Sequence, residues 1–315
     1  MTSTAPDTTL LSPQVPEAEE FQSAEAAVDR LQLLYDLATD YLAARFAETM
    51  RDGPTQQHYR AYYPEIRITT TSFLQADSRL SFGHVAGPGP YSTTVTRPDL
   101  FRSYLIQQIG LLLKNHGVPV WIGASQTPIP IHFAIQGDQD TVVPSHGAAG
   151  FSLRDMFDVP DLNTTNDDIV NGPAVAAPDG TIPLAPFTAQ RVDYSLARLA
   201  HYTATAPEHF QSYVLLTNYQ FYVAEFEAYA RQQLADPTSG YTSFVSSGNC
   251  ELTDPVGVIA PVPRLPQMPS YHLKRADGTG ITLVNIGVGP SNAKTATDHI
   301  AVLRPHSWLM VGHCA

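Results

Sequence analysis

The chain has 315 residues, of which 43% are apolar, so it is long enough for two domains with cores of ordinary size. A formal net charge of −12 argues against nucleic-acid binding, because a phosphate backbone attracts a basic face. The sequence has no apolar run of about 18 residues that could span a membrane, no N-terminal secretion signal and only two cysteines, Cys250 and Cys314, which predicts a cytoplasmic protein without a disulfide framework.

The N-terminal part of the chain predicts a tail followed by a long helix. Residues 1–20 are rich in Thr, Ser, Pro and Glu, a composition typical of a disordered tail. Residues 23–51 repeat apolar side chains every three or four positions, which predicts an amphipathic helix. Alternating β-branched and polar residues then predict strands at 66–73, 80–85 and 91–96.

A candidate anion site lies where the last of these strands leads into a predicted helix at residues 98–116, which Gly117 ends. The residues that border the start of this helix are Thr93, Thr94, Thr96 and Arg97. Free backbone N–H groups, the helix dipole and a guanidinium would all favour phosphate. The same residues are also consistent with a capped helix start beside a surface arginine.

Two more strands, at 119–124 and 129–135, complete a predicted α+β domain over residues 21–187. Asp138 and Asp140 in the loop QGDQDTVVP could bind a divalent ion, but a solvated acidic loop is the commoner arrangement, and we predict no metal site. Residues 157–187 lack a periodic pattern and are rich in Pro, Asp, Asn and Ala, which indicates a long surface connection.

Residues 188–315 form the second predicted domain. Its first predicted elements are a helix at 191–203, strands at 213–217 and 241–245, a helix at 221–234 and an edge strand at 271–274. Asn218 and Tyr219 form the turn between the first of these strands and the helix that follows it. The prolines within residues 250–271 predict an extended loop there.

The last stretch, residues 281–315, has the pattern strand, glycine-rich turn, helix, strand. Apolar runs predict the strands at 281–286 and 308–311. Between them, Gly287 and Gly289 break the first strand, Pro290 and Ser291 suit a helix start, and Pro305 ends the helix. Such a unit implies a parallel sheet with a right-handed crossover, whose strands end at one rim. We therefore expect Gly287–Ser291 and Gly312–Cys314 at the same rim, although a G-x-G turn also occurs without any ligand.

Several stretches of the sequence resemble the AMP nucleosidase family, in the same order along the chain. They are RITTTSF, YSTTVTRPDLFRSYL, RVDYSLARLAHYT, YVLLTNYQFYVAEF and NIGVGPSNAKTATDHIAVLRPHSWLMVGHCA. The resemblance runs from about Leu31 to Ala315. It implies that the second domain is a partial α/β nucleoside-phosphorylase-like (Rossmann-like) catalytic domain. It also implies hydrolysis of AMP to adenine and ribose 5-phosphate, by a homo-oligomer that needs no cofactor and responds to Mg-ATP as an activator and to phosphate.

The resemblance further implies roles for residues at the rim. Superfamily members that use phosphate as the nucleophile carry an Arg and a Ser or Thr where this chain has Met310 and His313. Without those phosphate-binding side chains, water is the expected nucleophile, and His313 is expected to position or activate that water. The residues expected to bind substrate are Asn218, Tyr219, Gly287, Gly289, Ser291 and Gly312. Three alternatives stay open: Asn218 serving turn geometry, His313 bonded to backbone at a strand end, and Met310 packing in the core.

The chemistry also needs acids that this sequence does not identify. Adenine leaves poorly as an anion, so an acid must protonate the purine and a carboxylate must hold the ribose hydroxyls. The resemblance places these groups on later strands, and no Asp or Glu here matches them. We therefore expect a truncated form that lacks the general acid and exposes an apolar edge strand. Two functions stay open: AMP nucleosidase, or a catalytically inactive fragment that binds nucleotide or joins an assembly.

Overall fold

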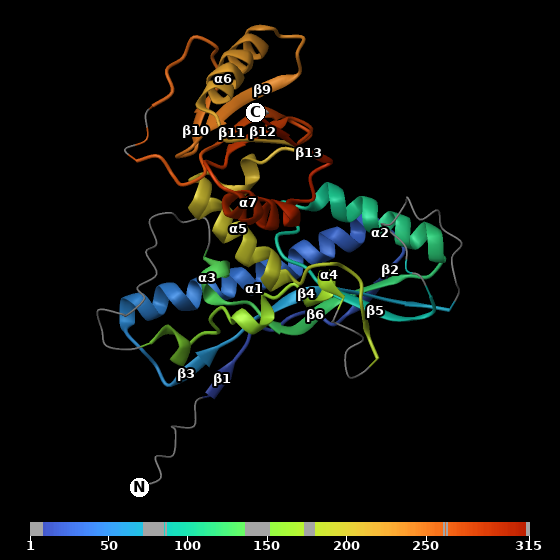
Figure 1. Ribbon diagram of the computed structural model, residues 1–315. Helices are drawn as coiled ribbons and strands as arrows, with labels where there is room; N and C mark the ends of the chain where they lie inside the picture. The colour runs from blue at the N-terminus through green and yellow to red at the C-terminus, as the bar shows by residue number, and fades with distance from the viewer. Residues whose placement is uncertain are drawn as a thin grey trace. The chain divides into compact units, whose positions relative to one another are not determined.

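The computed structural model describes residues 9–71, 85, 87–135, 152–172, 180–260, 262 and 264–312. The chain divides into two compact units, Met1–Tyr194 and Ser195–Ala315, which we call the first and second unit (Figure 1). This division falls inside helix α5 (Ala189–Thr203), whereas the sequence suggested a boundary at 187/188. The predicted strand at 80–85, apart from Val85, and both Asp138 and Asp140 lie outside the described residues.

The first unit is built on a five-stranded sheet. Its strands, in spatial order, are β2 (Glu19–Phe21), β6 (Val120–Pro128), β4 (Tyr62–Thr70), β5 (Gly89–Thr94) and β7 (Ile182–Pro183). Neighbours are antiparallel except β5 and β7, which are parallel. A separate parallel pair joins β1 (Thr9–Leu11) to β3 (Gln57–Tyr59). The prediction of a disordered tail over 1–20 is therefore wrong for the parts of that segment that form β1 and β2, because both strands pair with distant partners.

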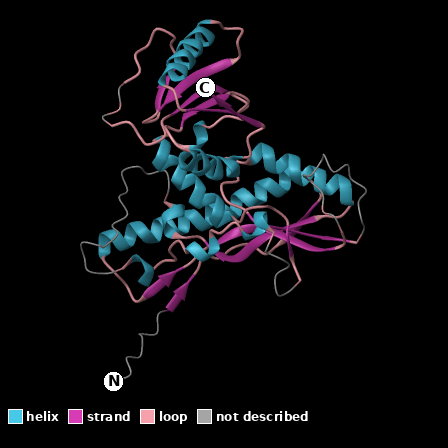
Figure 2. Ribbon diagram, in the orientation of Figure 1, coloured by secondary structure: helices cyan, strands magenta, loops and turns pink. Residues whose placement is uncertain are grey.

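Two long helices pack on one face of this sheet (Figure 2). Helix α1 (Ala24–Asp52) confirms the predicted helix at 23–51, and the Ser23 hydroxyl caps it by accepting from the Ala26 N–H. Helix α2 (Arg102–His116) ends at Gly117 in the left-handed conformation, as predicted. Their buried side chains, with Ile66, Ile68, Val120 and Ile122 of the sheet, form one continuous core.

The rest of the first unit consists of short elements. Residues 129–135, predicted as a strand, instead contain helix α3 (Ile131–Ala134), because Pro128 and Pro130 end the strand β6 and start a helical turn. Within the predicted connection at 157–187, the described residues form the short helices η2 (Leu162–Thr164) and α4 (Asp168–Asn171). A 3-10 turn, η1 (Leu153–Asp155), comes before the connection.

The second unit is built on a mixed six-stranded sheet. Its spatial order is β10 (Cys250–Leu252), β9 (Tyr241–Ser246), β11 (Ser270–Arg275), β12 (Ile281–Asn285), β8 (Tyr213–Thr217) and β13 (Ser307–Val311). Strands β12 and β13 flank β8 and run parallel to it, while the pairs on the β10 side are antiparallel. Strand β11 lies inside the sheet, so its prediction as an edge strand is wrong.

Helices cover both faces of this second sheet. Helix α6 (Gln220–Ala235) packs on one face through Val223, Phe226 and Ala230, against Phe244, Leu273 and Leu283. On the other face, Leu199 of α5 and Ala296 and Ile300 of α7 (Pro290–Ile300) pack against Val214, Leu216, Val284 and Ile286. Two short 3-10 turns complete the unit: η3 (Pro207–His209) precedes β8, and η4 (Ala301–Leu303) follows α7. No helix in the described ranges is long and apolar enough to cross a membrane.

A polar network is buried beneath the centre of the second sheet. The His272 ring is fully buried, with Nδ1 2.9 Å from Thr282 Oγ1 and Nε2 3.0 Å from Ser270 Oγ and 3.1 Å from Thr205 Oγ1. Burial, helped by nearby His209 and Lys274, holds the pKa of His272 well below its usual value. The network therefore favours a neutral imidazole in the folded state.

We expect acid to destabilise the second unit through His272. In the unfolded chain this histidine regains a pKa of about 6.5 and takes up a proton that the folded state resists. The free energy of unfolding should therefore fall as the pH drops below about 6.5, by at most ~1.4 kcal/mol per pH unit. Urea unfolding at about pH 7 and about pH 5 measures this slope. His272→Gln should reduce the slope, and an unchanged slope in that variant would contradict the assignment.

Candidate functional site

The carboxyl ends of three parallel strands meet at one rim of the second sheet. Thr217 at the end of β8 is in register with Asn285 of β12 on one side and with Val311 of β13 on the other. The chain segments that follow, beginning at Asn218, Ile286 and Gly312, therefore emerge side by side. This confirms the predicted placement of the glycine turn and Gly312 at one rim, the usual place for ligands in parallel sheets. His313 and Cys314 lie outside the described residues.

Asn218, Tyr219 and Gly312 lie next to one another at this rim. The Tyr219 N–H donates to Thr217 Oγ1 at 3.2 Å, which fixes the turn between β8 and α6. A Cβ built on Gly312 would lie 3.6 Å from the Tyr219 ring and 3.8 Å from Asn218 Oδ1. That Asn218 oxygen is buried and accepts no hydrogen bond from any described residue. A buried acceptor without a donor is costly, so this atom is suited to receive one from a ligand.

The glycine turn lies on the other side of β8. The Gly287 N–H donates to Asn285 Oδ1 at 3.1 Å, and Gly287 and Gly289 have φ of +63° and +112°, which favour glycine. Gly289 is the N-cap of α7, no side chain caps it, and Pro290 occupies the first turn. Ser291 is therefore inside the helix, exposed, rather than at its cap. The first N–H groups of α7 thus face the rim without a side-chain acceptor from the cap residue.

The predicted anion site in the first unit differs from its expected geometry. Helix α2 begins at Arg102, so Thr93, Thr94, Thr96 and Arg97 do not border its first turn, and that part of the prediction is wrong. Thr96 Oγ1 donates to Asp193 at 2.7 Å, Thr94 Oγ1 accepts from the Ala189 N–H, and the Arg97 guanidinium binds Asp99. Thr93 Oγ1 donates to the Thr94 carbonyl. A phosphate role for these residues stays a prediction.

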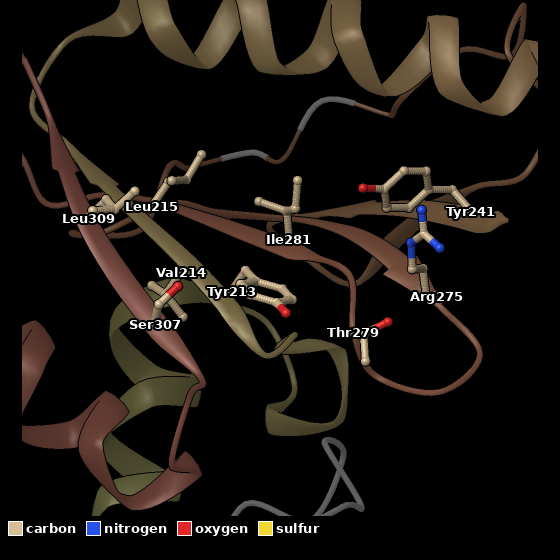
Figure 3. Close-up of a pocket in the computed structure, with 9 residues that line it drawn as sticks. All are labelled: Tyr213, Val214, Leu215, Tyr241, Arg275, Thr279, Ile281, Ser307 and Leu309. Atoms are coloured by element: carbon tan, nitrogen blue, oxygen red, sulfur yellow. The ribbon is translucent and has the colours of Figure 1, made fainter. Parts of the chain in front are cut away.

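A separate hollow of about 510 Å³ opens at the amino ends of the same strands (Figure 3). Leu215, Ile281 and Leu309 form part of its lining, and Tyr241 and Arg275 lie together at one end, with the guanidinium 4.3 Å from the tyrosine ring centroid. None of the predicted site residues lines it. Since Tyr213, Ile281 and Ser307 are in register at the start of the strands, this hollow lies at the end of the sheet opposite the rim.

Comparison with known proteins finds sequences similar to this chain. Residues 26–181 match the family described as bacterial AMP nucleoside phosphorylase N-terminus. The AMP nucleosidase of Escherichia coli strain K12 is 40% identical over 299 residues, which cover 91% of this chain and 61% of that protein. This chain is similar to AMP nucleosidase over most of its own length. The AMP nucleosidase of Escherichia coli O157:H7 gives the same values, so this chain spans 61% of the length of these curated relatives.

A crystal structure of AMP nucleosidase from Bacteroides thetaiotaomicron VPI-5482 also matches. It is 22% identical, with a TM-score of 0.27, over 39% of this chain and 40% of that one. A match at that level supports no argument about the fold.

Three further residues shape the rim but were not predicted from the sequence. Asn285 holds the glycine turn through its side-chain oxygen, and Asn292 Nδ2 donates to the Ile286 carbonyl at 2.9 Å. Thr217 supplies the acceptor for the Tyr219 N–H. A usable signal was present for Asn285, because an Asn two residues before a Gly is typical of an Asx turn. No comparable pattern marks Thr217 or Asn292.

Proposed function

We propose that the rim formed by β8, β12 and β13 binds AMP and belongs to an active site that hydrolyses its N-glycosidic bond, giving adenine and ribose 5-phosphate. The observation that carries this proposal is the 40% identity to AMP nucleosidase across 91% of the chain. The rim supports it, because three parallel strand ends, two glycines with positive φ and the buried Asn218 oxygen converge there.

The finer assignments belong to the same proposal. The second unit is a nucleoside-phosphorylase-like domain, consistent with its mixed sheet covered by helices on both faces. The chain acts in the cytoplasm as a homo-oligomer, needs no cofactor for the reaction, and responds to Mg-ATP and phosphate. Thr93, Thr94, Thr96 and Arg97 are the residues that we assign to phosphate binding in the first unit. Binding there would have to displace contacts that Thr96 and Arg97 make with Asp193 and Asp99.

Each rim residue has a part in the proposed chemistry. The Asn218 Oδ1 atom accepts a hydrogen bond from a ribose hydroxyl, which satisfies its unmet acceptor. The backbone of Gly287, Gly289 and Ser291 approaches the substrate closely because no side chain of the two glycines intervenes. Tyr219 and Gly312 form the wall of the proposed site next to β13. His313 follows Gly312 and positions the water that attacks the anomeric carbon.

The rim leaves one requirement unmet. Adenine must be protonated as it leaves, yet the described segments 217–219, 285–292 and 311–312 contain no Asp or Glu. This observation favours a second function for the chain acting alone, namely binding AMP without cleaving it. The two functions share the same binding site and differ only in whether an acid reaches it.

Calorimetry with AMP, followed by chromatographic assay of adenine, tests both functions on the 315-residue chain. We expect AMP to bind, and adenine release with or without Mg-ATP to stay at the uncatalysed level. Asn218→Ala should weaken AMP binding by about tenfold, which is the loss of roughly one well-placed hydrogen bond. Adenine release that His313→Ala abolishes would establish the hydrolase within these residues. Failure of the chain to bind AMP at all would contradict the proposal.

A further inference from the structure

Asp193, in α5, is the most deeply buried acidic residue among the described residues. It is 2% exposed. Tyr63 of β4 donates its hydroxyl to Oδ2 at 2.5 Å, and Thr96, in the segment after β5, donates to Oδ1 at 2.7 Å. The Thr96 hydroxyl also lies 3.4 Å from the Tyr35 hydroxyl of α1. One carboxyl group therefore ties α5 directly to β4 and to the segment after β5, and through Thr96 to α1.

The groups that face Asp193 provide little compensation for a negative charge. Those that can carry charge are Tyr35 of α1, Tyr63 of β4 and Arg97 in the segment after β5. Arg97 is the cation among them, and its guanidinium already makes short contacts with Asp99. Burial raises the pKa of Asp193 to about 7, although Tyr63, Thr96 and Arg97 act in the opposite direction. The same burial, with the charge of Asp193, raises the pKa of Tyr63 well above its usual value.

We infer that Asp193 is a proton-operated latch that holds the first turns of α5 against β4 and the segment after β5 when protonated, and releases them when ionised. In the protonated state the carboxyl donates its proton to one neighbouring hydroxyl and accepts from the other. In the ionised state both oxygens only accept, and the buried charge is stabilised when α5 opens and water enters. The proton leaves to bulk solvent in that opening.

The position of the latch along α5 makes its release consequential. The Gln190 side chain donates to the Pro128 carbonyl, and Arg191 binds Asp167 at 2.7 Å, so the first turn has further anchors in the first unit. Helix α5 then continues without a break to Thr203, past the division between the two units after Tyr194. Asp193 is thus next to the point where the helix leaves the first unit. This inference does not depend on the proposed reaction with AMP.

Hydrogen exchange of the α5 amides, followed from about pH 5 to about pH 8 on the 315-residue chain, tests the latch. The folded pKa is raised above the unfolded value, so the closed form loses stability as the pH rises and the loss is complete above about 7. After correction for the intrinsic exchange rate, the opening equilibrium should increase by up to about tenfold per pH unit below pH 7 and level off above it.

Three variants separate a latch from a purely structural contact. Asp193→Asn keeps the shape and cannot ionise, so opening should become independent of pH. Tyr63→Phe removes a donor to the ionised carboxylate, so the levelling-off should move to higher pH; this variant decides the matter if Asp193→Asn does not fold. The matched control Asp167→Asn removes the Arg191 contact on the same helix, and should raise opening equally at every pH. A wild-type chain without pH dependence, or a slope that persists in Asp193→Asn, would overturn the inference.

Discussion

Replacing Gly280 by alanine is expected to lower the free energy of unfolding of the second unit by ~3 kcal/mol, the upper end of what overpacking usually costs. A Cβ at this position would lie 2.2 Å from the Leu273 carbonyl oxygen and 3.0 Å from the Arg275 nitrogen, both in the backbone of β11. It would also lie 2.6 Å from Gln211 Oε1, which accepts from the N–H groups of Gly280 and Arg275. The collision is therefore with atoms that cannot move without breaking the start of β12.

Urea unfolding followed by Trp308 fluorescence, in a Trp121→Phe background, reports on the second unit, because these are the two tryptophans of the chain. Gly278→Ala is the matched control. Gly278 has a φ of +76°, and no atom lies within 4 Å of the place that a Cβ would take, so alanine should cost only ~1 kcal/mol through its backbone conformation. Equal losses in the two variants would show that steric exclusion at Gly280 is not the cause.

Replacing Gly312 by residues of increasing size is expected to block the proposed AMP site. Alanine should be tolerated, because its Cβ would make ordinary contacts, at 3.6 Å and 3.8 Å, with Tyr219 and Asn218. Phenylalanine should fill the rim between β8 and β13 and reduce AMP affinity by at least about a hundredfold, equivalent to roughly 2.7 kcal/mol. Because Gly312 has no positive φ, neither change strains the backbone.

Calorimetric titration with AMP measures the series. The urea midpoint of Gly312→Phe should match that of the parent chain, which separates blockage of the site from unfolding. Unchanged AMP affinity in a folded Gly312→Phe would place the nucleotide elsewhere, for instance at the hollow beside Tyr241 and Arg275.

The sequence was most informative where local chemistry decides the structure. Apolar periodicity predicted α1 over residues 23–51, and Gly117 marked the end of α2, because both signals act within a few residues. The run from Ile281 to Val311 predicted the β12–α7–β13 unit for the same reason. Apolar period, glycine turn and proline helix start all indicated one arrangement there.

Distant pairing explains what the sequence did not reveal. Residues 9–11 and 19–21 have a tail-like composition and become strands only because β3 and β6 offer them partners. The composition of β11 does not distinguish an edge strand from an interior strand, so its position depends on the strands that pair with it after folding. At the rim, the missing donor for Asn218 Oδ1 depends on which atoms surround it after folding, which no spacing of residues along the chain encodes.

Strand β13 carries a consequence for handling the protein. It is the last strand on its side of the described sheet, and Trp308, Leu309 and Met310 are 42%, 63% and 56% exposed. An apolar edge strand of this kind, without a charged side chain from Ser307 to Val311, promotes aggregation that increases with protein concentration. Titrations and unfolding curves therefore belong at low micromolar protein, and a lysine in place of the exposed Leu309 is the simplest way to keep the preparation monodisperse.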